Sequence, residues 1–284
     1  MSSLSTPATG GPEPLLLLLD PAARQTDGES VRIAKDVLCG GADVKVVYPE
    51  SPSELDRVLS HRGRRRPVVI GSDLALQRVL QALYRQRELG ADPVGMVPVG
   101  RSEELSAARA LGVPGEPVRA ARAVLSGASR KFDLLVDDGG GVALGGVRIT
   151  GAGARRPGGR TSGWRSLWAK LAAAEQANAL TADGRPSAEH HPRIRVEADG
   201  RLLADVHRPV RLVQVTLPGG EPDGGGVLEV VVRASGALVR ARAASVSVVG
   251  RGFGYEADGH PVGPVRARTW TAHPGAWGLL LPAA

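Results

Sequence analysis

The sequence has very little cysteine and few aromatic residues, and both scarcities narrow the classes of protein that fit. Cys39 is the single cysteine among 284 residues, so no disulfide can form within the chain, and a reducing compartment is indicated. We expect Cys39 to pack near the end of a helix. Aromatic residues make up 3% of the chain, and no nucleic-acid recognition motif is present. We therefore expect a cytoplasmic protein with no nucleic-acid partner.

Long hydrophobic runs are also lacking, because Leu15–Leu19 is far too short to span a bilayer. The net charge is +7, and 32 of the 36 basic residues are arginine. That bias is as typical of a GC-rich genome as of a function. Local basic clusters leave two interpretations open, solvated loops or peripheral contact with an anionic membrane. The clustered residues are Arg62, Arg64, Arg65, Arg66, Arg155, Arg156 and Arg160.

The first half of the chain alternates short apolar runs with helical patterns. Residues 1–13 have a composition typical of a disordered tail, and residues 14–138 form the predicted nucleotide-binding-type domain. Strand and helix alternate five times, which predicts an α/β domain with an open, doubly wound, mostly parallel sheet. Ligands of such sheets bind beyond the carboxyl ends of the strands. The predicted buried parallel strands are Leu15–Leu19, Val44–Tyr48, Val68–Ile70, Val94–Val97 and Leu134–Val136.

The second half, residues 139–284, has a different texture. Short alternating strands are separated by turns of glycine, proline and aspartate, which predicts an antiparallel β-sandwich domain. One helix is expected near Trp164–Ala179. Glu189-His190-His191 lacks a second pair at metal-ligand spacing, so we expect an exposed loop there and no metal site.

Two predicted strand ends carry sequences with the layout of phosphate-binding turns. Gly71-Ser72-Asp73-Leu74-Ala75 follows one strand, and Gly100-Arg101-Ser102-Glu103-Glu104 follows the next. The layout resembles the diacylglycerol kinase and sphingosine kinase-like lipid kinases, which have G-G-D-G-T and G-T-G-N-D at these turns and an NAD kinase-like fold. Asp20-Pro21 after the first strand resembles the family's N-P-x-x-G, and Ala257–Pro261 resembles its D-G-E-P turn.

The resemblance implies a nucleotide site and an acid-base pair. Nucleotide-binding positions would be Asp20, Pro21, Gly71, Ser72, Asp73, Gly100, Arg101 and Ser102. Asp258 would be the catalytic base, and Asp73 would orient the metal or the substrate, with ATP and Mg²⁺ as cofactors of an active enzyme. The structural alternatives are an ordinary Asp-Gly turn at Asp258 and an ordinary helix cap at Asp73.

Both turns depart from the family pattern. Leu74 would be strained if its backbone were left-handed, and a carboxylate at Glu103 would repel phosphate. Alternatively, Ser102 caps the following helix and the two glutamates satisfy its first turn. These departures predict weak nucleotide binding.

Three functions remain open on the sequence. The chain is an ATP-dependent lipid kinase, or a catalytically inactive relative that binds nucleotide or lipid and acts through partners, or a scaffold whose interdomain cleft holds another small molecule. The departures at the turns after three strands favour weak or lost activity. The sequence does not indicate the oligomeric state.

Overall fold

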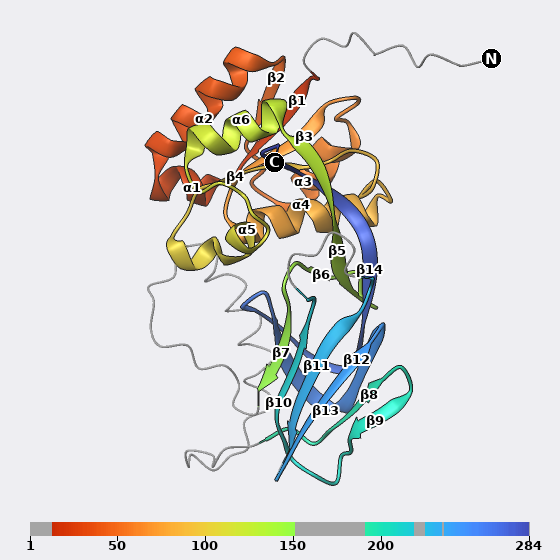
Figure 1. Ribbon diagram of the computed structural model, residues 1–284. Coiled ribbons are helices and arrows are strands. Elements are labelled where there is room, and N and C mark those ends of the chain that lie inside the picture. The colour runs from red at the N-terminus through yellow and green to blue at the C-terminus, as the bar shows by residue number, and fades with distance from the viewer. Residues whose placement is uncertain (1–12, 151–190, 219–224, 235, 284) are drawn as a thin grey trace, which may run out of the picture. The chain divides into compact units, whose positions relative to one another are not determined.

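The computed structural model describes residues 13–150, 191–218, 225–234 and 236–283, and it divides into two compact units (Figure 1). The first unit comprises Met1–Gly145, Leu217–Val227 and Ala272–Ala284, and the second comprises Gly146–Thr216 and Leu228–Thr271. The ranges predicted from sequence, 14–138 and 139–284, are continuous, whereas the first unit takes in two later segments. The predicted helix at 164–179, the tail at 1–12 and the basic cluster at 155–160 lie outside the described residues.

A four-stranded parallel sheet forms the centre of the first unit. Its order is β2-β1-β3-β4, and each neighbouring pair is parallel. The five leucines of β1 are all buried, which is typical of a strand covered on both faces. This confirms the predicted α/β domain. The strands are β1 (Leu15–Leu19), β2 (Val44–Val47), β3 (Arg66–Gly71) and β4 (Gly95–Pro98).

Helices cover both faces of this sheet, as the alternating leucines of β1 show. Leu15, Leu17 and Leu19 belong to one buried cluster with residues of α2 and α6, whereas Leu16 and Leu18 belong to another with residues of α3 and α4. Cys39 lies near the end of α2 but is exposed, so the expectation that it packs was wrong. No helix among the described residues is long and apolar enough to cross a membrane. The helices are α1 (Pro21–Thr26), α2 (Gly28–Gly41), α3 (Pro52–Ser60), α4 (Asp73–Arg85), η1 (Ser102–Glu104), α5 (Ser106–Ala110) and α6 (Pro117–Ser126).

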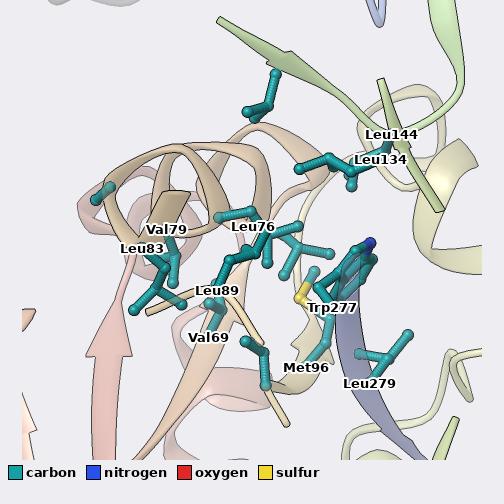
Figure 2. Packing of buried hydrophobic residues seen from close by; sticks show 14 of the residues in the cluster. Val69, Leu76, Val79, Leu83, Leu89, Met96, Leu134, Leu144, Trp277 and Leu279 are labelled. Atoms are coloured by element: carbon teal, nitrogen blue, oxygen red, sulfur yellow. The ribbon is translucent and has the colours of Figure 1, made fainter. Parts of the chain in front are cut away.

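A distant segment of the chain adds a parallel neighbour to β4. Val94 donates its N–H to Gly278 O at 2.8 Å and accepts from the Leu280 N–H at 3.0 Å, and Val94 and Leu279 form a parallel bridge. Figure 2 shows Trp277 and Leu279 at the end of β14 packing into the same buried cluster as Met96 and Leu76. The end of β14 (His260–Leu281) is thus part of the first unit's core.

The prediction that Leu134–Val136 is a parallel strand of this sheet was wrong. These residues lie in β5 (Ala128–Asp137), which pairs antiparallel with β6 (Val142–Ala143). Both Leu134–Val136 and the end of β14 are short, buried and apolar, so their local sequence does not show which of them joins the parallel strands.

The second unit is antiparallel, as predicted, and its strands belong to one ten-stranded sheet with β5, β6 and β14. Two of its hairpins turn at Asp-Gly pairs, Asp199-Gly200 and Asp258-Gly259, where both residues have positive φ. This is the type I′ turn, whose twist matches that of antiparallel strands. The remaining strands are β7 (Gly146–Thr150), β8 (Ile194–Ala198), β9 (Arg201–Ala204), β10 (Val210–Thr216), β11 (Leu228–Ala234), β12 (Ala237–Ala243) and β13 (Ser245–Ala257).

Candidate functional site

The residues that follow β1, β3 and β4 meet at one edge of the parallel sheet, because the carboxyl ends of parallel strands share an edge. Asp20 donates its backbone N–H to Ile70 O at 3.0 Å, and Val99 donates its N–H to Gly71 O at 2.9 Å. These bonds bring together the three segments that the sequence predicted as nucleotide-binding. The residues gathered here are Asp20, Pro21, Gly71, Ser72, Asp73, Gly100, Arg101 and Ser102.

Asp20 and Gly71 are in close contact at this edge. A Cβ atom added to Gly71 would lie 2.6 Å from the Asp20 Cβ, so only glycine fits without a shift. Asp20 Oδ1 accepts a hydrogen bond from the Ala22 N–H at 3.0 Å and caps α1, while Oδ2 accepts from the Ser72 hydroxyl at 3.3 Å. The close packing of the strand ends is therefore sufficient to explain why residue 71 is glycine, without a bound phosphate.

Asp73 is the first residue of α4, is 8% exposed, and bonds to a different helix. Its carboxylate oxygens accept hydrogen bonds from the N–H groups of Ala107 at 2.7 Å and Ala108 at 2.9 Å. These are amides of the first turn of α5, which would otherwise lack partners. Asp73 therefore acts as a cap, as the structural alternative held, but it caps α5 and not its own helix.

The turn after β3 differs from the glycine-rich turn that the resemblance implies. The chain passes from β3 through Ser72 directly into α4, and Leu74 and Ala75 lie in the first turn of that helix. Leu74 therefore has no left-handed backbone and carries no strain of that kind. The chain forms a short strand-to-helix junction here, and Ser72 and Leu74 stand where the family pattern has glycine.

The turn after β4 is closed by Glu104. The Arg101 N–H donates to Glu104 Oε2 at 3.2 Å, and the Glu104 N–H donates back to Arg101 O at 2.9 Å. A Cβ atom added to Gly100 would lie 3.3 Å from the same Oε2 atom, so this carboxylate lies directly against Gly100. It occupies a backbone donor that would be available to an anion in an open turn.

Ser102 does not cap a helix, contrary to one of the two interpretations of the sequence. It begins the short 3₁₀ helix η1, and both its carbonyl and its hydroxyl oxygens accept hydrogen bonds from Arg109 Nη2, at 2.5 and 2.8 Å. The reason is that the chain makes a 3₁₀ turn before α5, so that Leu105 and not Ser102 takes the N-cap position of α5.

Arg78 is a cation at this edge that the sequence did not predict. It lies on α4 near Asp20 and stays more than a third exposed. The surrounding protein lowers the pKa of its guanidinium by desolvation, and the Asp20 charge opposes this shift; an arginine in this setting remains protonated at neutral pH. The available signal was a basic residue on the exposed face of the helix that follows β3.

Asp258 belongs to the second unit, in the turn between β13 and β14. Its Oδ1 atom accepts a hydrogen bond from the Gly146 N–H at 3.0 Å, and its own N–H donates to Gly146 O at the same distance. The aspartate thus links the β13–β14 hairpin to the start of β7. This is a structural role for the residue that the resemblance implies as the base.

Three arginines of the basic cluster near Arg62 form ion pairs within the first unit. Arg62 is buried and pairs with Glu88 and with Asp92, the latter at 3.6 Å; Arg65 pairs with Asp43 at 2.9 Å, and Arg66 pairs with Glu13. These ion pairs fix the entry into β3. They leave Arg64 as the member of this cluster with no ion pair among the described residues.

Comparison with known proteins agrees with the architecture. No protein-family model and no curated protein matches the sequence. Three solved structures from Bacillus anthracis str. Sterne match over nearly the whole chain: two candidate diacylglycerol kinases, with TM-scores of 0.72 and 0.66 and identities of 16% and 17%, and a diacylglycerol kinase, with a TM-score of 0.63 and 14% identity. The chain has the diacylglycerol kinase fold. The alignments cover 96–98% of this chain and 98% of each of those chains, so the fold extends through both units.

Proposed function

We propose that this protein derives from ATP-dependent lipid kinases and that its own nucleotide-dependent phosphorylation of a lipid hydroxyl is weak or lost. The observation that carries the proposal is that side-chain carboxylates occupy backbone donors at the strand ends. Asp20 takes the Ala22 amide, Glu104 takes the Arg101 amide, and Asp73 takes the Ala107 and Ala108 amides. A triphosphate would have to displace these internal anions or bind elsewhere.

ATP and Mg²⁺ therefore fit this edge poorly. A carboxylate at about 4 Å repels a phosphate charge by roughly 4 kcal/mol at an effective dielectric near 20, and by less where water reaches the pair. For the metal, no group of three or more histidine, cysteine, aspartate or glutamate side chains is suitably arranged within the described residues. Arg78 and Arg101 supply positive charge at the edge, but point charges do not replace a cradle of aligned amides.

A second candidate is a catalytically inactive relative that still binds a nucleotide or a lipid and acts through partners. The Arg78 guanidinium favours retained anion binding, because no described carboxylate forms an ion pair with it. Both candidates predict little turnover, and they differ in whether any nucleotide binds.

Calorimetric titration with Mg-ATP tests the proposal. We expect no binding in the micromolar range, because internal carboxylates already occupy the backbone donors. A working kinase, in contrast, has a KM for its substrates of about 1 mM or below. Binding of the wild-type protein in the low micromolar range would refute the proposal. Weak binding that is abolished by Arg78→Gln would instead support the second candidate.

Two variants test the specific role of Glu104. Glu104→Gln removes the internal negative charge and should increase nucleotide binding, whereas Glu103→Gln removes the same charge from a neighbouring exposed side chain and should change binding less. If the two variants bind nucleotide equally, Glu104 has no special role in the turn.

If phosphoryl transfer to a lipid is detected, Asp258→Asn tests whether Asp258 is the catalytic base. Turnover that is retained in this variant would show that Asp258 is not the base.

A further inference from the structure

One face of the second unit's sheet carries arginines on β7, β11 and β12, which lie within the four consecutive strands β12-β11-β10-β7. In the strand register Arg148 of β7 lies opposite Gln214, Arg240 of β12 lies opposite Val231, and Arg233 of β11 lies between Leu212 and Leu238. Residues that face each other across paired strands project from the same side of a sheet. The intervening residues Val147 and Ile149 of β7 and Val230 and Val232 of β11 are buried. Those of β12, Val239 and Ala241, are half-buried. The arginines therefore lie on the more exposed side of the sheet.

Within the described part of the chain, these arginines have no carboxylate partner within ion-pair distance. Arg148, Arg233 and Arg240 are exposed, and each lacks an ion pair among the interactions of the described chain. On the same face Arg242 pairs with Glu229 at 3.4 Å, and Glu256 lies opposite Arg148 without forming such a pair. The described part of the second unit contains twelve arginines, no lysine and six carboxylates. Among the described residues of this unit, arginines therefore outnumber carboxylates two to one.

Aliphatic side chains lie among the arginines. Leu238 is 51% exposed, and Leu212 and Val231 on the same face are half-buried. Guanidinium groups bind phosphate oxygens in a bidentate manner, and exposed aliphatic groups favour contact with the apolar part of a lipid interface. Proteins that hold single-stranded nucleic acid also use aromatic residues for stacking, and the paired positions of this face contain none.

We propose that this arginine face, formed by Arg148, Arg233, Arg240 and Leu238, is a docking surface for a bilayer that contains anionic phospholipid. The arginines bind the phosphate groups, and Leu238 reaches the apolar side of the headgroup layer. The inference extends the proposed function, since a lipid-related protein works at a membrane. It does not depend on nucleotide, so it can fail or succeed independently of the strand-edge site.

Sedimentation with vesicles tests the docking surface. Wild-type protein is mixed, without nucleotide, with vesicles of phosphatidylcholine alone or with one third phosphatidylglycerol, at low salt. We expect binding to the anionic vesicles only. The triple variant R148Q/R233Q/R240Q should bind about a hundredfold more weakly, because each arginine near an anionic surface contributes about fivefold.

A matched control removes the same charge from the first unit. R64Q/R119Q/R122Q changes three exposed arginines that also lack ion pairs with described residues, and its binding should stay within about fivefold of wild type because these side chains lie outside the docking face. Equal losses in the two triple variants overturn the proposal, since only the overall charge would matter. Absence of wild-type binding to anionic vesicles overturns it as well.

Two further measurements keep the result interpretable. Thermal melting checks that the triple variant is folded; if it melts early, the single variant R240Q should still lose about fivefold, and no loss contradicts the proposal. Leu238→Ser should reduce the vesicle binding that persists at high salt. If that binding is unchanged, only the arginine charges contribute, and Leu238 is not part of the docking surface. Displacement of the protein from vesicles by single-stranded RNA at equal phosphate concentration would assign the face to nucleic acid instead.

Discussion

Asp73 and Ala108, which are 35 positions apart, are joined by a hydrogen bond of 2.9 Å from the backbone N–H of Ala108 to the Asp73 carboxylate. The second oxygen of the same carboxylate accepts from the Ala107 N–H at 2.7 Å. A side chain at the start of α4 thus holds the start of α5 in place. The link shows how the strand edge is stabilised by its own acidic residues.

The first prediction concerns this carboxylate. Asp73→Asn should lower the free energy of unfolding by about 1 to 3 kcal/mol, because one amide then faces a side-chain NH₂ group and the bonds to a charged acceptor are lost. Urea unfolding measures the change. Asp36→Asn is the control, since Asp36 is an exposed partner of Arg32 and its loss should cost less than about 1 kcal/mol. Equal effects would show that the buried cap has no special weight.

The second prediction concerns Gly71. Gly71→Ala should destabilise the protein by about 1 to 3 kcal/mol, because the added methyl group would meet the Asp20 Cβ at 2.6 Å and force the strand ends apart. Gly40→Ala provides the comparison, since no atom lies within 4 Å of its added Cβ, and alanine in a helix should stabilise by about 0.5 to 1 kcal/mol. Thermal melting of both variants is sufficient, and a neutral Gly71→Ala would contradict the close contact.

The third prediction is a pH dependence at the start of α2. Hydrogen bonds from the Ser30 hydroxyl and N–H to the Asp27 carboxylate lower the pKa of Asp27. A lowered folded pKa means that the stabilisation is present above the unfolded pKa of about 3.9 and is lost as the pH falls through the folded pKa. Asp27→Ala should therefore cost about 0.5 to 2 kcal/mol at pH 7 and less at acidic pH. The stability of the Asp27→Asn variant itself should show no loss at acidic pH from this position, because asparagine caps without titrating. A cost of Asp27→Ala that stays constant with pH would refute the prediction.

The fourth prediction concerns Trp277, which is fully buried in the first unit and donates its indole N–H to Asp133 O at 3.3 Å. Trp277→Ala should cost about 3 to 5 kcal/mol. Hydrogen exchange should become faster for the amides of β1 and β3, while exchange in β10 and β11 changes little. Leu202→Ala, at an exposed position of β9, serves as the control. Equal acceleration in both units would show that Trp277 does not act on the parallel sheet in particular.

Much of the first unit could be predicted from the sequence, because its signals are local. Five leucines in succession predict a strand buried on both faces, and the stripe from Leu76 to Leu83 predicts the buried side of α4. The choice between Leu134–Val136 and the end of β14 as a neighbour of β4 could not be made in the same way. Both segments are apolar and short, and the pairing of Val94 with Leu279 joins residues that are far apart in the sequence.

The candidate site was predictable in position but not in detail. The rule that parallel strands end at one edge placed Asp20, Gly71 and Gly100 together. Which carboxylate meets which amide depends on the spatial position of α5 and η1, so the bonds of Asp73 and Glu104 could not be read from spacing. Similarly, the Asp258-Gly259 pair predicted a turn, but its link to Gly146, 112 positions away, is a tertiary contact.

The bridge between Val94 and Leu279 has a consequence for the order in which the protein is made. During synthesis β1 to β4 leave the ribosome long before residues 277–281. Until then the parallel sheet lacks the strand that pairs with Val94, and its core lacks Trp277. Autonomous folding of residues 1–145 is therefore not expected, and a premature stop codon just before Trp277 would damage the half of the molecule that was translated first.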